Sequence, residues 1–159
     1  MLSTARALLD LPLPSRPARE QLAPVLRAAE VPTFWRERAE WQLANAQPTG
    51  VPLGAGVIIP SAWEPGAHLP HLIVALLAGN RVLLPTTADH HALLRAAEAA
   101  GLAMHGVGTS LANDNQLLTE PRMQFVTWWG DSHTGFTRSA ELAELAPGQL
   151  APRRVWCQL

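Results

Sequence analysis

The stretch from residue 56 to residue 84 limits the fold of this 159-residue chain more than any other part of the sequence. It reads GVIIPSAWEPGAHLPHLIVALLAGNRVLL. A short apolar run, a turn containing Pro and Gly, a mostly apolar helix, a Gly-Asn stop and a second apolar run form the pattern of a β-α-β crossover. The two strands of such a unit run parallel, because the helix carries the chain back to the end where the first strand began.

The same alternation continues along the chain. Most of the strand candidates are continuous apolar runs, which is expected when helices cover both faces of a sheet. We therefore predict an α/β fold, a doubly wound, mainly parallel, Rossmann-like sheet of about five strands. The predicted strands are 56–60, 81–85, 103–107, 124–129 and 153–158, and the predicted helices are 64–78, 88–100, 134–145 and a short one within 109–121.

The first fifty residues differ from the rest, since they show helical periodicity and connecting segments without strand patterns. Helices are predicted at 3–10, 17–30 and 33–46, the second of them interrupted by Pro24. The length fits one compact domain. We expect residues 1–50 to form its helical N-terminal region and residues 51–159 its Rossmann-like α/β part.

Composition excludes several classes of function. The formal net charge is −1, from 12 basic and 13 acidic residues, so neither nucleic acid nor a membrane surface is an expected partner. Every basic residue is Arg, which excludes Schiff-base chemistry and the Lys of a P-loop. The single Cys157 forms no internal disulfide, so we expect a cytoplasmic protein. We also expect no signal peptide, because the first residues lack a basic region followed by a long apolar one, and no spanning segment, because the longest apolar run is too short.

Three motifs in order resemble one enzyme superfamily. Residues 54–102 read GAGVIIPSAWEPGAHLPHLIVALLAGNRVLLPTTADHHALLRAAEAAGL, residues 125–135 read FVTWWGDSHTG, and the chain ends in RRVWCQL. The aldehyde dehydrogenase superfamily has a strand ending in a Pro-Trp-Asn turn, a helix running to Ala-Gly-Asn and a strand ending in Lys-Pro-Ser-Glu. Its Phe-Thr-Gly-Ser-x-x-x-Gly turn is similar to residues 125–135, with Gly130 and Gly135 in step. The final residues fall where the family has the strand leading into Leu-Glu-Leu-Gly-Gly.

The resemblance implies a modified Rossmann domain with a cleft for NAD or NADP. It also implies that the half carrying the cysteine nucleophile and the general-base glutamate comes after the region matched here, so we predict no catalytic residue in this sequence. Cys157 falls on a predicted core strand, which indicates a buried structural thiol. If the cleft functions, its residues are Trp63, Glu64, Thr86, Thr87, Gly130, Asp131 and Gly135.

The chain departs from the family at the positions that bind cofactor. Glu64 replaces the oxyanion-stabilising Asn, and a carboxylate there repels a developing negative charge. Pro85 and Ala88 replace the Lys and Glu that hold the adenosine ribose. Asp131 replaces the Ser that faces the pyrophosphate and adds a like charge. We therefore expect that the chain binds no cofactor. If it does bind one, the resemblance implies NAD or NADP.

Three hypotheses about function follow. The first is a non-catalytic aldehyde-dehydrogenase-like domain that associates with itself or with a partner protein. The alternative is the NAD(P)-binding subunit of a split oxidoreductase whose second polypeptide supplies the cysteine. A minor alternative is a GDS-type esterase, since Gly130, Asp131 and Ser132 spell the nucleophile block of that class, although the adjacent His133 is badly placed to activate the serine.

Histidine and tryptophan raise two further questions. His68 and His71 share a predicted helix face and His90 and His91 lie near the next helix start, but no cysteine or paired carboxylate completes either set, so no metal site is predicted. Six Trp residues are many for this length. Phe34, Trp35 and Trp41 are expected to cover the sheet. Either the Trp residues are all core and rim residues, or some form an apolar surface that associates with a second copy or a partner.

Overall fold

The computed structural model describes residues 7–48, 50–59, 66–84, 91–107, 123–129 and 154–158. Residues 7–9 form a helical turn, and the elements that follow lie within a few residues of their predicted positions, except at 103–107. The helices are α2 (Arg19–Ala28), α3 (Thr33–Asn45), α4 (His68–Leu77), α5 (His91–Ala99) and the 3-10 helix η2 (Ala103–His105). The strands are β1 (Ala55–Ile59), β2 (Arg81–Leu83), β3 (Met123–Trp129) and β4 (Arg154–Gln158).

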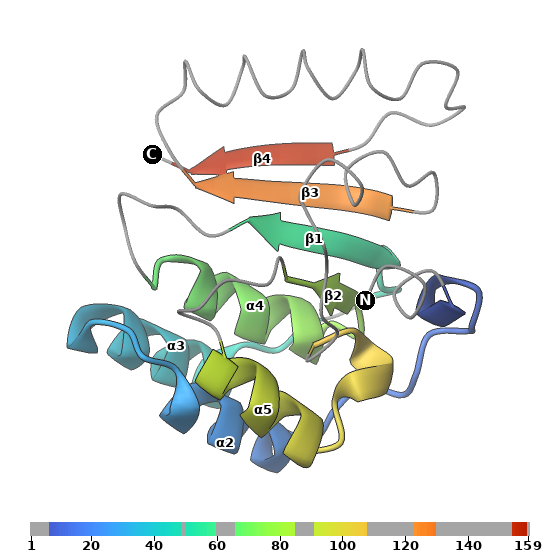
Figure 1. The fold of residues 1–159 in the computed structure, drawn as a ribbon. Coiled ribbons are helices and arrows are strands. Elements are labelled where there is room, and N and C mark those ends of the chain that lie inside the picture. Colours follow the sequence, from blue (N-terminus) through green and yellow to red (C-terminus); the bar gives the residue numbers. More distant parts are fainter. Residues whose placement is uncertain are drawn as a thin grey trace.

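The described strands form one four-stranded sheet in the order β2-β1-β3-β4, and every pair is parallel. Figure 1 shows the strands side by side, with the helices gathered around the β2 end of the sheet. Moving from β1 to β2 takes the chain in one direction across the sheet, and β3 lies on the other side of β1. This order matches the four central strands of a Rossmann sheet. The α/β class and the parallel sheet are thus confirmed.

The strand predicted at 103–107 is wrong. The segment forms η2, in which the His105 amide donates to the Leu102 carbonyl and the Gly106 amide to the Ala103 carbonyl, both at 3.0 Å. Only Val107 in this run is β-branched, so strand propensity is low and local turn bonds prevail. Gly106 has φ 94° and lies so close to β2 that a Cβ there would be 2.8 Å from the Val82 carbonyl oxygen. The described sheet therefore has four strands.

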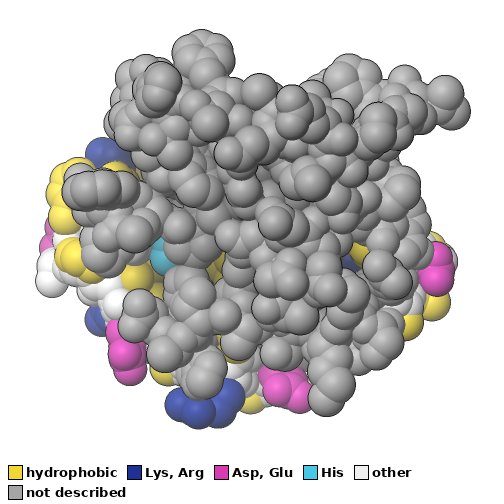
Figure 2. Space-filling model, turned by 45° about the horizontal axis from the view of Figure 1, so that its top comes forward, with side chains coloured by type: hydrophobic (Ala, Val, Ile, Leu, Met, Phe, Trp, Pro, Cys, Tyr) yellow, Lys and Arg dark blue, Asp and Glu magenta, His cyan; other side chains and the backbone are white. Residues whose placement is uncertain are grey.

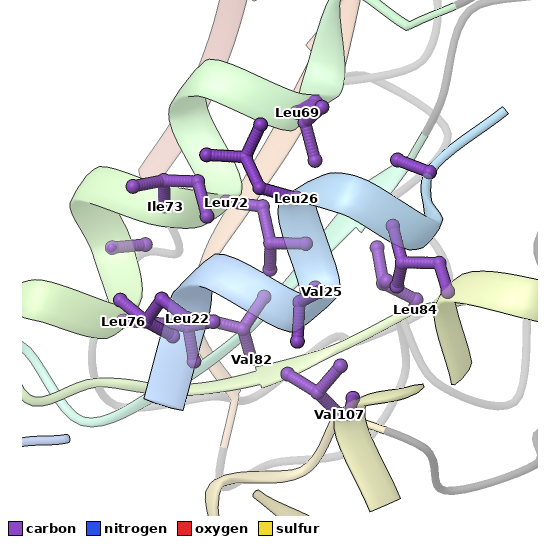
Figure 3. Close-up of a cluster of buried hydrophobic side chains, with 14 of the residues drawn as sticks. Leu22, Val25, Leu26, Leu69, Leu72, Ile73, Leu76, Val82, Leu84 and Val107 are labelled. Carbon is purple, nitrogen blue, oxygen red and sulfur yellow. The ribbon is translucent and has the colours of Figure 1, made fainter. Parts of the chain in front are cut away.

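One hydrophobic cluster joins the N-terminal helices to the α/β unit. Figure 3 shows apolar side chains of α2, α4 and β2 brought together in this cluster. Val82 and Leu84 face this cluster, while Leu83 points to the other face of the sheet. Each fully buried aliphatic side chain stabilises the fold by roughly 1.5–3 kcal/mol. The labelled members are Leu22, Val25, Leu26, Leu69, Leu72, Ile73, Leu76, Val82, Leu84 and Val107.

Pro24 lies inside α2, so the helix continues through the proline that the sequence marks as an interruption. The helices that the structure describes lie on one face and around the edge of β2. The helix predicted at 134–145 is outside the described residues, and helices on both faces of the sheet stay a prediction. Among the described helices, none is long and apolar enough to cross a bilayer.

Helix α3 packs mainly on α4 and α2. Trp35 is half-buried against the hydrophobic cluster, but Phe34 is 58% and Trp41 63% exposed. The expectation that all three aromatic side chains cover the sheet is therefore wrong. Because α4 already occupies the place next to the sheet, α3 forms an outer layer and turns one of its aromatic faces to solvent.

Arginine side chains bind backbone carbonyls and hold this outer layer. The Arg19 guanidinium donates to the carbonyls of Leu43 and Ala46, which lie at the C-terminal end of α3, where helix carbonyls lack intrahelical partners. The Arg36 guanidinium donates to the Ala29 carbonyl in the connection from α2 to α3. Gln21 links α2 to the end of α5 by donating to the Ala100 carbonyl at 3.2 Å.

Candidate cofactor cleft

The carboxyl ends of β1 and β3 lie next to each other. Ile59, the last residue of β1, pairs with Trp128, the second-last of β3. Since the chain leaves β1 toward β2 and places β3 on the opposite side, the boundary between β1 and β3 is a topological switch point. In open parallel sheets, ligands bind outside the carboxyl ends of the strands at this point.

All seven predicted site residues follow the carboxyl ends of three adjacent strands. The structure places the strand ends in the order β2, β1, β3. It does not place the site side chains, because the seven residues lie outside the described residues. By sequence, Trp63 and Glu64 follow β1, Thr86 and Thr87 follow β2, and Gly130, Asp131 and Gly135 follow β3.

The start of α4 is fixed by a glycine next to α3. Gly66 has φ 96°, and a Cβ on it would lie 2.7 Å from the Cβ of Val31. Its carbonyl accepts a hydrogen bond from the Leu69 amide at 3.0 Å. Only glycine meets both conditions, the left-handed φ and the close approach of Val31. The residue that precedes α4 is therefore packed against the segment that leads into α3.

The other end of α4 is closed by a Schellman motif. The Gly79 amide donates to the Leu76 carbonyl at 3.0 Å, and the Asn80 amide donates to the Ala75 carbonyl at 3.2 Å. Gly79 takes the required left-handed conformation, with φ 91°. The Asn80 side chain donates to the Ala75 carbonyl at 3.1 Å and accepts from the Gly54 amide at 3.2 Å. The Ala-Gly-Asn sequence thus holds α4, β1 and β2 in a fixed relation.

A buried arginine at the start of β2 was not predicted. Arg81 is 1% exposed, and its guanidinium donates to three carbonyls, those of Met104 at 2.9 Å and of Leu11 and Pro12 at 3.1 Å. The planar guanidinium presents several donors in a fixed fork, which suits three carbonyls from two segments. The signal in the sequence was a charged residue at the start of an otherwise apolar strand.

Burial also affects the histidines. His68 and His71 both lie on α4, and burial lowers the pKa of His71 below its ordinary value of 6.5. His105 is buried at the edge of β2, and its Nε2 lies 2.9 Å from the Ser15 carbonyl oxygen, so Nε2 carries the proton and donates. Within the described ranges, no three His, Cys, Asp or Glu side chains come together as a group able to hold a metal ion.

Two other sequence hypotheses have different outcomes. Cys157 lies inside β4 and pairs with Trp128, so it is on a strand, as predicted. The esterase block at Gly130, Asp131 and Ser132 is outside the described residues, as is His133, and the structure does not test that alternative.

The strand order and the crossover helix define a Rossmann-like α/β fold, a type that binds dinucleotides at the carboxyl edge of its sheet. No protein-family model matches the sequence. Two curated relatives, the 1-pyrroline-5-carboxylate dehydrogenases of Geobacillus thermodenitrificans and of Geobacillus sp. strain WCH70, are each 31% identical over 119 residues. The match covers 69% of this chain, and the chain spans 23% of the length of these relatives.

Solved structures share the fold over nearly the whole chain. HpcC from Thermus thermophilus gives a TM-score of 0.65 at 17% identity, covering 99% of this chain and 39% of its own. A glyceraldehyde-3-phosphate dehydrogenase from Methanocaldococcus jannaschii, complexed with NADP, gives 0.60 at 12% identity, covering 99% and 44%. An NAD-dependent benzaldehyde dehydrogenase from Corynebacterium glutamicum gives 0.58 at 17% identity, covering 99% and 46%. The curated relatives and these structures point to the aldehyde dehydrogenase superfamily, which confirms the resemblance seen in the sequence.

Proposed function

We propose that this chain is a non-catalytic aldehyde-dehydrogenase-like domain that associates with itself or with a partner protein. The observation that carries the proposal is the chemistry at the carboxyl edge of the sheet. After β2, Pro85 and Ala88 stand where the resemblance implies Lys and Glu. After β1, Glu64 stands in place of Asn, and after β3, Asp131 stands in place of Ser. The scaffold for a dinucleotide is kept, while the side chains that would bind it are replaced.

The size of the expected loss follows from the kind of contact. A hydrogen bond to a charged group contributes about 1.5–3 kcal/mol, so each lost contact weakens binding by roughly 10- to 100-fold. Asp131 adds repulsion of the pyrophosphate. Loss of two or three such contacts moves a micromolar dissociation constant to the millimolar range or beyond.

The association part of the proposal is supported by α3. Its outer face exposes Phe34 and Trp41, two large aromatic side chains on a helix that already has its packing partners in α2 and α4. Exposed aromatic residues grouped on one surface are typical of sites that contact another protein.

The second candidate function is an NAD(P)-binding subunit of a split aldehyde-dehydrogenase-type oxidoreductase. The observation in its favour is the switch point between β1 and β3, which is the position of the dinucleotide in folds of this type. The M. jannaschii structure of the same fold holds NADP.

Titration with NAD and NADP separates the two candidates. By sequence, Trp63 follows β1, and Trp128 and Trp129 are the last two residues of β3, so Trp fluorescence is the readout chosen for this edge of the sheet. We expect no saturable quenching up to about 1 mM cofactor. A micromolar dissociation constant would overturn the non-catalytic proposal and favour the oxidoreductase subunit.

The Asp131→Ser variant tests the electrostatic reason. If the carboxylate repels the pyrophosphate, the variant binds NAD about tenfold or more tightly than the unmodified chain. Glu98→Gln, which removes one charge from the exposed surface of α5, is the matched control and leaves the titration unchanged. An Asp131→Ser titration identical to that of the control contradicts the charge argument.

A further inference from the structure

Four exposed residues form a stripe along the solvent face of α3, which we call the α3 stripe. They are Phe34, Glu37, Arg38 and Trp41, at spacing i, i+3, i+4 and i+7, so they lie on one helix face. Ala39, on the opposite face, is fully buried. In Figure 1, α3 lies at the outer left of the helical layer, and the left edge of Figure 2 shows hydrophobic side chains among charged ones.

The aromatic end of the stripe is held in place within the chain. The Phe34 ring meets the Trp35 ring edge to face, with centroids 4.9 Å apart and an interplanar angle of 79°. The Arg38 guanidinium lies 5.6 Å from the centroid of the Phe34 ring, in a cation-π contact. Since Trp35 is half-buried against the core, its contact with Phe34 restricts the Phe34 ring before any partner binds, which lowers the entropy lost on binding.

The order of residues along the stripe is self-complementary. When a helix lies antiparallel to a copy of itself about a two-fold axis between residues 37 and 38, Phe34 faces Trp41 of the copy, and Glu37 faces Arg38 of the copy. The same two pairs recur on the other side of the axis. Both aromatic pairs and both charge pairs are favourable, whereas a parallel arrangement places identical charges opposite each other.

We propose that α3 is a homodimerisation helix, which pairs antiparallel with α3 of a second copy through the α3 stripe. This inference rests on the proposed function, because it names the surface and the partner of the association. A pair of short helices is smaller than the interface of about 1,600 Å² found in stable complexes, so the dimer is reversible, with a dissociation constant of about 10–100 µM.

Sedimentation velocity from about 5 to about 500 µM protein tests the pairing. The unmodified chain is expected to shift reversibly from monomer to dimer. In the Glu37→Arg dimer, the new Arg at position 37 faces Arg38 of the copy on both sides of the axis, and in the Arg38→Glu dimer the new Glu faces Glu37. Each variant alone therefore weakens the dimer about tenfold or more. An equimolar mixture of the two variants restores association, because every charge then meets its opposite in a heterodimer.

Glu98→Arg on the exposed surface of α5 carries the same charge change as Glu37→Arg and is expected to dimerise like the unmodified chain. A monomer at all concentrations overturns the proposal, as do single variants that dimerise normally or a mixture that stays monomeric. If the unmodified chain and both single variants dimerise equally, association itself stands and only this surface is wrong. The other part of the proposed function, the loss of NAD and NADP binding, is tested separately by the cofactor titration.

Discussion

The buried guanidinium of Arg81 allows the sharpest test of how the N-terminal segment is attached. The side chain is 1% exposed and donates to the carbonyls of Leu11, Pro12 and Met104. Replacing it by Met keeps a long apolar stem and removes all three hydrogen bonds. Arg81→Met therefore separates the contribution of the polar contacts from that of packing.

The magnitude follows from two opposing terms. Three hydrogen bonds from a charged donor contribute about 1.5–3 kcal/mol each. Against this loss, the Met variant no longer has to bury a charged group, which avoids a desolvation cost of several kcal/mol. We expect a net loss of about 2–4 kcal/mol in the free energy of unfolding. Arg81→Lys is expected to lose at least as much, because one ammonium retains the buried charge but cannot reach carbonyls of two segments.

Urea unfolding followed by Trp fluorescence measures the loss, and hydrogen exchange locates it. Amide protection in the η2 segment and around Ser15 should fall more than protection in β1, because Arg81 joins the N-terminal segment to β2. Arg95→Met, at an exposed position of α5, is the control and should stay within about 0.5 kcal/mol of the unmodified chain. An Arg81→Met variant as stable as that control would refute the reasoning.

Two further predictions concern a glycine and a histidine. Gly106→Ala adds a Cβ 2.8 Å from the Val82 carbonyl oxygen at a residue with φ 94°, and should lower the free energy of unfolding by about 2–4 kcal/mol. The control Gly50→Ala has a similar φ of 86° but open space around the new Cβ, and should lower it by about 1 kcal/mol. Equal losses of stability in urea unfolding would contradict the proposed clash. Because burial lowers the pKa of His71 below 6.5, stability should be retained above that pH and fall as the pH drops toward the folded-state pKa. His71→Gln should reduce the fall in unfolding free energy between about pH 7.5 and about pH 5.5, and an undiminished fall would assign the effect to other groups.

The crossover from β1 to β2 could be predicted because its signals are local. Gly79 and Asn80 end α4 through bonds to residues within the same helix, and the apolar runs on either side need both faces covered. The prediction at 103–107 was wrong because strand formation there depends on residues far away in the sequence. Whether such a short run pairs as a strand depends on the neighbouring chain, and here Arg81 and His105 make hydrogen bonds to the N-terminal segment, at Leu11 and Ser15, while residues 103–105 form η2.

The orientation of α3 could not be read from its sequence. Trp35 lies about 100° around the helix from Phe34 and about 120° from Trp41, so α3 has aromatic residues on two faces and only one of these faces can pack on α4. Long-range bonds decide between the faces. Arg19 binds the carbonyls of Leu43 and Ala46 at the end of α3, and these contacts join residues far apart in the sequence.

The residues that specify the fold and those that would bind a cofactor are separate sets. Leu72 and Val82 form the core, and Gly79 and Asn80 close the helix, whereas the substituted position Asp131 follows a strand end. Removing the binding chemistry from such turns takes no side chain from the core cluster, so it costs the described fold none of the burial that stabilises it. A Rossmann-like sheet can therefore persist without its dinucleotide contacts.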